Sequence, residues 1–360
     1  MLIDSIELEN FRNYGSLKLD LDGGINIFCG DNAQGKTNIL EAVYLICTSK
    51  SQKLSKDRDM IRFGYDESHL KAVILKNEMR YRIDMHLKRN NSKGIALNGI
   101  PIKKVSELLG IANVVSFSPE DLNIIKNGPS ERRRFMDLEL CQLNRIYVHD
   151  LISYNRVLNQ KNRLLKNLQF DRSSEEFLDI YNEQLIKYGS EIISLRRSFV
   201  EKLDHLIRDF HSDITGNSER LTLKYEPDTT EESFYDDLEK HRDNELKNCF
   251  SLVGPHKDDI KFTFNDTDLR QYGSQGQQRT AVLSLKLAEI AFVEEVSGNR
   301  PLLLLDDVLS ELDRNRQNKL LNSIKDIQTL ITCTGLDDFV ENRFRMDKVF
   351  LVKDGLVTAK

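Results

Sequence analysis

Short apolar segments occur towards both ends of the chain and predict β-strands there. They are rich in β-branched and aromatic residues and are bounded by turn-forming residues. Before residue 117 we expect strands at 3–9, 17–21, 25–29, 70–75, 80–87 and 94–97, the last followed by an Asn98-Gly99 hairpin turn. After residue 250 the pattern returns at 260–264, 302–305, 329–332 and 349–352. The two ends therefore predict one α/β unit, built from residues 1–117 and 251–360.

The middle of the chain has a helical period instead. Apolar residues recur at spacings of four and three from 136 to 158 and again from 181 to 210. Between them, residues 171–176 supply a turn and a Ser-x-x-Glu capping box. We expect an antiparallel helical pair with coiled-coil-like seams, each helix roughly 35 residues and about 50 Å long. Residues 118–250 are therefore predicted to form a helical arm inserted into the α/β unit.

A phosphate-binding loop follows one of the predicted strands. The octapeptide G-D-N-A-Q-G-K-T fits G-x-x-x-x-G-K-[ST] and lies between an apolar strand and a predicted helix. In such a loop the backbone N–H groups and the helix N-terminus bind phosphates, the lysine reaches the β- and γ-phosphates, and the hydroxyl binds Mg²⁺. The alternative is a chance Gly-rich turn, which would not require this order of strand, loop and helix. The predicted ATP-binding residues here are Gly30, Asp31, Asn32, Ala33, Gln34, Gly35, Lys36, Thr37 and Asn38.

Paired carboxylates at the end of a second apolar strand complete the predicted site. Residues 302–305 form a continuous apolar segment, typical of a strand buried on both faces, and Asp306 and Asp307 follow it. We predict that Asp306 and Thr37 bind Mg²⁺, and that Asp307 orients or deprotonates the attacking water. Many ATPases have Glu at the latter position; because Asp is one methylene shorter, we expect slow hydrolysis. Two Asp residues that only cap the next helix are the structural alternative.

The separation of these two segments predicts the organisation of the whole chain. Asp306 lies 276 positions after Gly30, so a large insertion divides one nucleotide site. This layout is typical of a split ATPase head that carries an arm, and a small-molecule kinase would not need it.

Composition narrows the classes of function. The chain has 39% hydrophobic and 30% charged residues, and no apolar run approaches the ~20 residues of a membrane span. The N-terminus lacks the features of a secretion signal. The five cysteines have no metal-like spacing, and the seven histidines form no zinc-enzyme motif. We therefore expect a cytoplasmic protein with no membrane partner.

The charge distribution is uneven, although the net charge is −5. Residues 76–104 carry eight Lys/Arg against two acidic residues, a local charge of +6, and residues 131–166 carry eight against four, a local +4. Such runs are either solvated faces or a surface that meets a phosphate backbone. On the second interpretation, the predicted DNA contacts are Lys88, Arg89, Lys93, Arg132 and Arg133.

A further segment, Y-G-S-Q-G-Q-Q-R at 272–279, precedes a predicted helix. It includes Ser274, 32 positions before Asp306, and resembles the signature loop of ATP-binding-cassette (ABC) ATPases. In those proteins the loop contacts the γ-phosphate bound to the opposite subunit, and S-E-L-D at 310–313 resembles their subunit-crossing D-loop. The resemblance implies an ABC-type P-loop ATPase head in which Ser274, Gly276 and Gln277 act in trans.

Motifs along the whole chain resemble the RecF family, bacterial recombination-mediator ATPases related to structural-maintenance-of-chromosomes (SMC) heads. They are F-R-N-Y at 11–14, P-E-D at 119–121, G-P-S-E-R-R-R-F-M-D at 128–137, G-P-H-K-D-D at 254–259 and D-D-V-L-S-E-L-D at 306–313. The resemblance implies an ATP-dependent homodimer that binds double-stranded and gapped DNA. It also implies cooperation with RecR and RecO to load RecA in replication, repair and the SOS response. Arg12 of the first motif is assigned to ATP.

Some positions depart from the ABC pattern. Thr332 stands where those ATPases place a switch His, so we expect it to contact the γ-phosphate. No clear Q-loop Gln precedes the arm, and residues 254–259, with His256, have no assigned role. Two alternative functions stay open: an SMC-like structural head, against which the short arm weighs, and a metabolic P-loop kinase, which leaves the signature loop and arm unexplained.

Overall fold

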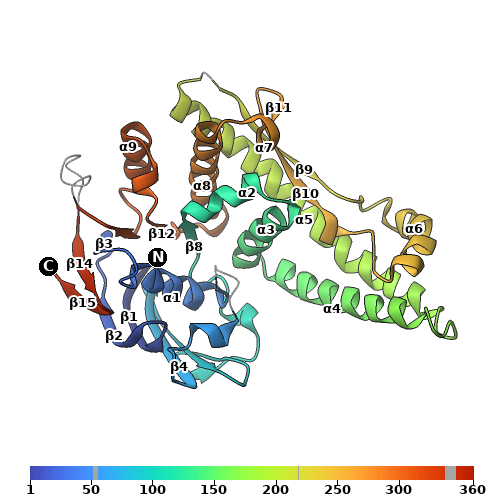
Figure 1. Cartoon of the computed structure of the whole chain (residues 1–360), viewed down its shortest axis with the longest axis horizontal. Coiled ribbons are helices and arrows are strands. Elements are labelled where there is room, and N and C mark those ends of the chain that lie inside the picture. The colour runs from blue at the N-terminus through green and yellow to red at the C-terminus, as the bar shows by residue number, and fades with distance from the viewer. Residues whose placement is uncertain (52–55, 218, 337–345) are drawn as a thin grey trace. The chain divides into compact units, whose positions relative to one another are not determined.

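The computed structural model describes residues 1–51, 56–217, 219–336 and 346–360. The chain divides into two compact units, Met1–Asp121 with Leu283–Lys360, and Leu122–Val282 (Figure 1). The predicted head (residues 1–117 and 251–360) and arm (residues 118–250) stay a prediction, and their second boundary differs from that of these two units. We expected the return to the head at residue 251, whereas it falls at residue 283. The reason is that strand β10 (Asp259–Phe264) pairs with β9 (Leu221–Glu226) inside the second unit.

A mostly parallel sheet forms the base of the first unit. Its order is β15-β14-β3-β13-β12-β8, and the pairs between β14 and β8 are all parallel. Every residue of β3 and β13 is buried, which explains why neither strand contains a charged side chain. The strands are β3 (Ile25–Cys29), β8 (Val114–Phe117), β12 (Leu302–Asp306), β13 (Thr329–Cys333), β14 (Lys348–Lys353) and β15 (Leu356–Ala359).

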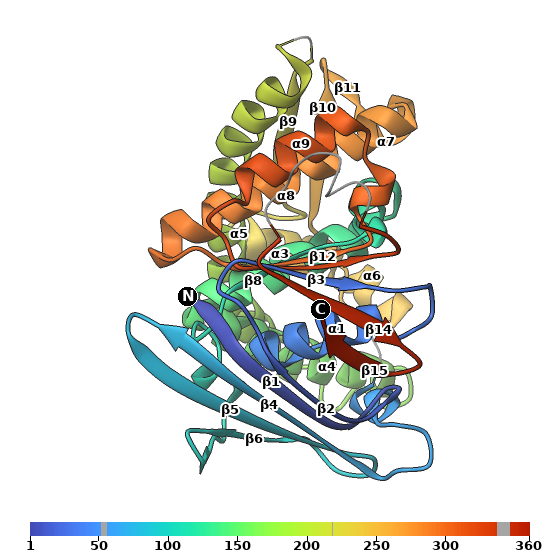
Figure 2. The same ribbon diagram turned by 90° about the vertical axis from the view of Figure 1, so that its left-hand side faces the viewer.

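An antiparallel sheet forms the other layer of this unit, with strand order β2-β1-β4-β5-β6-β7 (Figure 2). Asn98 and Gly99 both have positive φ in the predicted hairpin turn between β6 and β7. One face of the sheet contributes apolar side chains to a core shared with helix α1 (Lys36–Thr48). The strands are β1 (Leu2–Phe11), β2 (Tyr14–Asp20), β4 (Glu67–Lys76), β5 (Met79–Lys88), β6 (Gly94–Leu97) and β7 (Ile100–Pro101).

The second unit contains the predicted pair of long helices, α4 (Arg145–Asn167) and α5 (Phe177–Thr215), packed against each other. The predicted length of about 35 residues is wrong for the first helix. The helical conformation is interrupted at Asn144, which separates α3 (Pro129–Leu143) from α4. The Asn144 side chain accepts hydrogen bonds from the N–H groups of Ile146 and Tyr147 and so begins a new helix. This unit is also not purely helical, since β9, β10 and β11 (Thr267–Asp268) form a small sheet.

The remaining helices are short or connect these elements. They are α2 (Asn123–Lys126), α6 (Phe234–Asn248), α7 (Leu269–Tyr272), α8 (Gln275–Ser297) and α9 (Arg314–Ser323), with 3-10 turns at Asp57–Met60, Val105–Glu107, Pro119–Leu122, Pro255–Lys257 and Leu309–Glu311. Among the helices within the described ranges, none combines the length and the apolar character needed to span a membrane.

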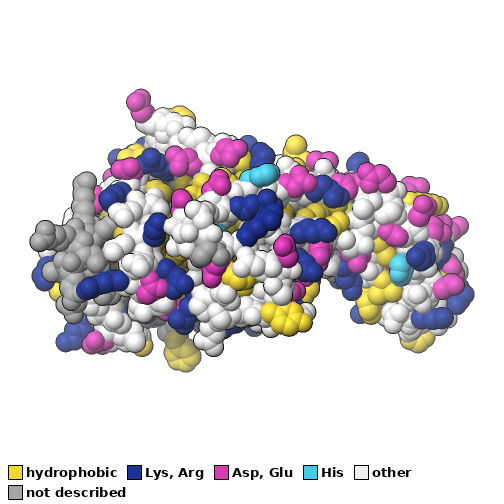
Figure 3. Space-filling model, turned by 90° about the horizontal axis from the view of Figure 1, so that it is seen from above, with side chains coloured by type: hydrophobic (Ala, Val, Ile, Leu, Met, Phe, Trp, Pro, Cys, Tyr) yellow, Lys and Arg dark blue, Asp and Glu magenta, His cyan; other side chains and the backbone are white. Residues whose placement is uncertain are grey.

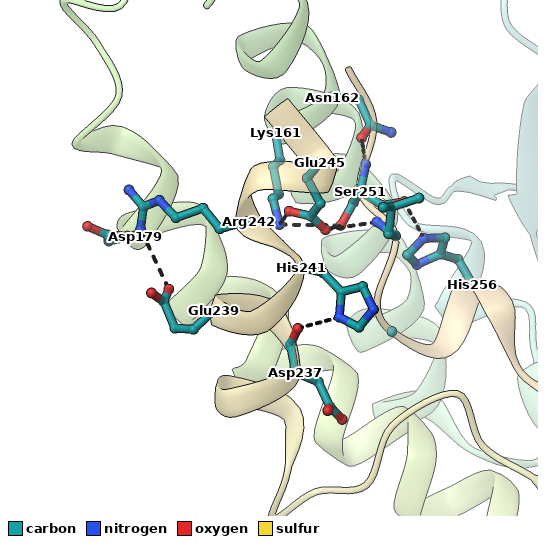
Figure 4. A network of polar contacts seen from close by, with 12 residues as sticks. Lys161, Asn162, Asp179, Asp237, Glu239, His241, Arg242, Glu245, Ser251 and His256 are labelled. Carbon is teal, nitrogen blue, oxygen red and sulfur yellow. Dashed lines mark hydrogen bonds and ion pairs between the residues drawn. The ribbon is translucent and has the colours of Figure 1, made fainter. Parts of the chain in front are cut away.

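A buried polar network ties residues 254–259 to the arm helices of the second unit. The Arg196 guanidinium, on α5, donates to the carbonyl of Pro255 at 2.6 Å and to the carboxylate of Asp258 at 2.9 Å. His256 accepts from or donates to the Tyr154 hydroxyl at 2.7 Å through Nδ1. Nearby, the Lys161 ammonium lies 2.6 Å from the Glu245 carboxylate (Figure 4). Because these groups are buried and mutually bonded, the G-P-H-K-D-D segment has a structural role in holding the arm.

Candidate nucleotide site

The phosphate-binding loop lies between β3 and α1, as predicted. Gly35 has φ +106, a conformation that favours glycine, and a Cβ there would meet the Asn13 side chain at 2.3 Å. Gly30 is equally confined, because a Cβ there would lie 2.1 Å from the Val352 carbonyl oxygen. The positive φ at Gly35 and the close approach of the Val352 backbone at Gly30 explain why both positions of the motif are Gly.

The ammonium of Lys36 is held inside the loop. The residue is 6% exposed, and Nζ donates to the carbonyls of Gly30 at 2.5 Å and Asp31 at 2.8 Å. These two hydrogen bonds compensate the ammonium for its loss of water and also fix its position in the loop. Its charge is therefore concentrated where the loop would bind phosphates.

The carboxylate of Asp306 joins the two halves of the site. Asp306 Oδ1 accepts a hydrogen bond from the Thr37 hydroxyl at 2.7 Å and another from the Thr332 hydroxyl at 2.8 Å. Thr332 is the parallel-strand partner of Asp306, so sheet register places this hydroxyl. The oxygen of Thr332 also accepts from the N–H of Asp307 at 2.9 Å. The donor set of hydroxyl and carboxylate oxygens fits Mg²⁺, which prefers hard oxygen ligands.

A small cavity of about 230 Å³ opens beside these oxygens. Asp307 lines it with φ +58, an uncommon conformation for a residue other than Gly and one that is often found at functional sites. Residues 118–120, from the segment 118–121 that occupies the place of the Q-loop in the sequence, also reach the cavity. The complete lining is Thr37, Leu40, Glu41, Ser116, Ser118, Pro119, Glu120, Asp306 and Asp307.

Sequence reasoning did not single out Glu41 and Ser116 of this lining. Glu41 is buried on α1 and Ser116 is buried on β8. Neither belongs to a motif, and Ser116 could have been found only by recognising 114–117 as the edge strand next to β12.

The F-R-N-Y segment braces the loop from outside. Asn13 donates to the carbonyl of Gln34 at 3.1 Å and accepts from the Asn38 side chain at 2.8 Å. The Tyr14 hydroxyl donates to the carbonyl of Gly35 at 3.0 Å, and burial raises the pKa of this phenol well above its usual range. These contacts tie strands β1 and β2 to the loop geometry.

Arg12, predicted to contact ATP, forms a bidentate pair with Glu41, with N···O distances of 2.7 and 2.8 Å. Its remaining nitrogen donates to the carbonyl of Asp59 at 2.9 Å. Because Glu41 lines the cavity, Arg12 lies behind a cavity residue, and its contact with ATP stays a prediction.

The predicted signature loop begins α8 and caps it. The backbone N–H of Ser274 donates to the side chain of Gln277 at 2.9 Å, and the N–H of Gln277 donates to the Ser274 hydroxyl at 3.3 Å. This reciprocal pair is a capping box. Ser274 and Gly276 are exposed, so the helix N-terminus is open to an anion as well as capped.

The structure contradicts part of the predicted DNA surface. Arg132 is 3% exposed and pairs with Asp259 through two nitrogens, at 2.5 and 2.9 Å. Arg133 donates to the carbonyl of Asp258 at 2.8 Å. Arg132 therefore holds α3 against β10 and was wrongly assigned to DNA, because a buried, paired guanidinium is not available to a phosphate.

The predicted DNA contacts in the first unit, Lys88, Arg89 and Lys93, lie close to acidic side chains that partly neutralise their charge. The Lys93 side chain is 17% exposed and its ammonium contacts the Ser49 carbonyl and Asp57. Arg89 lies 3.2 Å from Asp66, and Lys88 lies 3.8 Å from Glu67. On the face seen in Figure 3, Lys and Arg side chains are interspersed with Asp and Glu. Lys88 and Arg89 keep exposed parts, so their contact with DNA stays a prediction.

Comparison with known proteins agrees with this geometry. The RecF/RecN/SMC N-terminal domain family matches residues 2–358. A protein from Lachnospira eligens named DNA replication and repair protein RecF is 57% identical over 359 residues, covering 99% of each chain. This chain belongs to the RecF family. A protein of the same name from Clostridium kluyveri is 44% identical over 364 residues. The alignment covers 99% of this chain and 100% of that protein.

Solved structures give the same assignment. The recombination mediator protein RecF with ATP, from the RecFOR pathway, superposes with a TM-score of 0.94 at 36% identity, covering 99% of this chain and 97% of that one. An SMC head bound to a domain of ScpA matches with a TM-score of 0.60 at 16% identity, which shows a shared fold. The predicted fold class, an ATPase head of the RecF and SMC type, is therefore confirmed.

Proposed function

We propose that this chain is an ATP-dependent recombination mediator that acts in DNA replication and repair. It binds ATP with Mg²⁺, forms a homodimer, and binds double-stranded DNA near single-strand gaps. With RecR and RecO it promotes loading of RecA, and it works in the cytoplasm. The observation that carries the proposal is the contact of Thr37 with Asp306, inside a chain that matches RecF proteins from end to end.

Each residue of the site has a distinct task in this proposal. Lys36 leaves its two loop carbonyls to bind the β- and γ-phosphates, while the loop N–H groups bind the remaining oxygens. Thr37 and Asp306 would hold Mg²⁺, which supplies charge neutralisation at the phosphates. Asp307 orients the attacking water, and its short side chain keeps hydrolysis slow, as suits a timed switch.

Dimerisation completes the site in this proposal. The start of α8, with Ser274, Gly276 and Gln277, presents exposed N–H groups and a hydroxyl to the nucleotide of a second copy. A monomer would then bind ATP without turning it over, and assembly on DNA would precede hydrolysis. The exposed parts of Lys88 and Arg89 would contribute phosphate contacts without base specificity.

The test is to measure ATP turnover and oligomeric state together, with and without gapped duplex DNA. We expect an ATP-dependent dimer, slow basal turnover and faster turnover with DNA. The Lys36→Met protein should lose all three responses. A monomer that turns over ATP rapidly and phosphorylates a small acceptor would support the kinase alternative instead.

A further inference from the structure

Three potential metal ligands meet on the antiparallel sheet of the first unit, outside the nucleotide site. They are Glu67 and His69 on β4 and His86 on β5, neighbouring strands of this sheet (Figure 2). One ligand atom from each lies within 4.8 Å of the others. None of the three belongs to the phosphate loop, the Asp306 strand or the signature loop, so the proposed function leaves them unexplained.

The sheet geometry brings these side chains to one face. His69 and His86 are directly opposite each other across the β4–β5 ladder, and Glu67 lies two residues before His69, on the same face. The imidazole rings stack with centroids 3.9 Å apart and an interplanar angle of 22°. The Nε2 atom of His86 lies 2.9 Å from a Glu67 carboxylate oxygen. Backbone pairing therefore holds both rings and the carboxylate together.

We propose that Glu67, His69 and His86 form a binding site for Zn²⁺. Two imidazoles and one carboxylate are a donor set that zinc accepts, with an open position for a further ligand. Ligand atoms on one tetrahedral zinc lie about 3.3 Å apart, given bonds of about 2.0–2.1 Å. The 2.9 Å distance between His86 Nε2 and the Glu67 carboxylate is that of a hydrogen bond, which zinc would replace by a slightly longer separation. The remaining gap closes by rotation of side chains that are free to move, since the Glu67 side chain is 52% exposed.

The surroundings favour an exchangeable site. His69 and His86 line a cavity of about 750 Å³ on this sheet face, together with Glu7, Glu9, Lys71 and Asp84. Glu9 is the cross-strand partner of His69 on β1, so a further carboxylate lies on the adjoining strand. A zinc ion here would link β4 to β5 and expose an open coordination position to this cavity. Lys88, 3.8 Å from Glu67, competes weakly for the carboxylate because the pair is exposed.

The test is Zn²⁺ titration of the full-length chain without nucleotide, in competition with a chromophoric chelator. We expect one zinc ion per chain, and affinity should fall at least about tenfold in His69→Ala and in His86→Ala. The matched control is His149→Ala, which removes an exposed histidine of the second unit and should bind zinc like the parent. Circular dichroism and ATP affinity should be unchanged in all three variants.

Co²⁺ substitution separates this site from cysteine binding. The spectrum should show tetrahedral d–d bands that are lost in the His69→Ala/His86→Ala double variant, without thiolate charge-transfer bands. Unchanged zinc stoichiometry and affinity in the double variant, or no zinc binding by the parent chain, would overturn the proposal. The cluster would then be a cross-strand polar pair that stabilises β4 and β5 alone.

Discussion

The hydroxyl of Thr37 donates a 2.7 Å hydrogen bond to the carboxylate of Asp306, across 269 positions of sequence. Both oxygens are the kind that Mg²⁺ binds, and both stand at the same edge of one parallel sheet. The contact shows that the loop and the carboxylate strand are two parts of one site.

Replacing Lys36 by Met should abolish productive ATP binding and leave the fold intact. The change removes a charge-assisted contact to the phosphates, so affinity should fall on the order of 100-fold. Calorimetric titration with ATP measures the loss, and thermal unfolding checks the fold. Lys50→Met, at an exposed position just after the C-terminal end of α1, is the matched control and should bind like the parent. Normal affinity in a folded Lys36→Met protein would contradict this role.

Asp307→Asn should separate binding from hydrolysis. The amide keeps the size of the side chain but cannot accept a proton, so turnover should fall by about 100-fold or more while ATP affinity changes little. Asp306→Asn should instead weaken the dependence of binding on Mg²⁺, because it removes a charged ligand. Single-turnover hydrolysis and Mg²⁺ titrations distinguish the two. If both variants lose hydrolysis and binding equally, the two carboxylates have no separate roles.

Ser274→Arg should permit ATP binding by the monomer and block ATP-driven dimerisation. Because Ser274 also caps α8, the control is Ser274→Ala, which removes the capping hydroxyl at a cost of about 1 kcal/mol without adding bulk. Light scattering with a non-hydrolysable ATP analogue should show a dimer for the Ala variant and a monomer for Arg. If Ser274→Arg still forms an ATP-dependent dimer, Ser274 does not act at the dimer contact and serves only to cap α8.

Arginine 132 and the exposed pair Lys88 and Arg89 should respond differently to mutation. Arg132→Ala should lower the free energy of unfolding by about 1–3 kcal/mol, because it removes the buried guanidinium that donates to Asp259 and to the carbonyls of Ile124 and Asn127. Denaturant unfolding measures this, with Arg156→Ala on the exposed face of α4 as the control. Lys88→Glu/Arg89→Glu should be stable but should weaken duplex-DNA binding, with a smaller salt dependence.

The DNA titration is done at two salt concentrations, with and without the ATP analogue. Equal affinity of the double variant and the parent in all four conditions would place the DNA elsewhere.

Acidification should destabilise the second unit through His256. Burial, the largest cause, lowers the pKa of this imidazole from 6.5 to about 4. Between these values the unfolded chain binds a proton that the folded chain does not, so the stability contribution is complete above pH 6.5. It is lost as the pH falls towards 4, by about 3 kcal/mol in all. His256→Gln should flatten the dependence of unfolding free energy on pH, whereas His149→Gln should leave it unchanged.

The features that could be predicted from the sequence are those determined by a few consecutive residues. The phosphate loop needs Gly at 30 and 35 for backbone reasons, and the apolar strands at 302–305 and 329–332 are recognisable because both of their faces are buried. Thr332 was placed in the site because its position corresponds to that of the switch His in ABC ATPases. Each of these signals lies within a few consecutive residues.

The parts that could not be predicted depend on distant partners. A run of Lys and Arg looks the same whether it faces water or, like Arg132, pairs with an Asp 127 positions away. The strand at 221–226 is short and follows a long helical pattern, and only its pairing with β10 makes it a strand and moves the boundary to residue 283. Glu41 likewise gains a role only through Arg12 and the cavity.

The position of β3 in its sheet has a consequence for synthesis of the chain. Both of its hydrogen-bonding neighbours, β13 and β14, lie after residue 328, whereas the antiparallel sheet uses only residues 2–101. At about 5–20 residues per second, a ribosome needs roughly 15 to 60 s to make the roughly 300 residues between them. The five residues of β3, four of them apolar, have no hydrogen-bonding neighbour in their sheet until those later strands are made. A chain that stops before residue 302 lacks β12 and β13, and with them Asp306 and Thr332, so it cannot assemble the hydrogen-bonded oxygen cluster around Thr37.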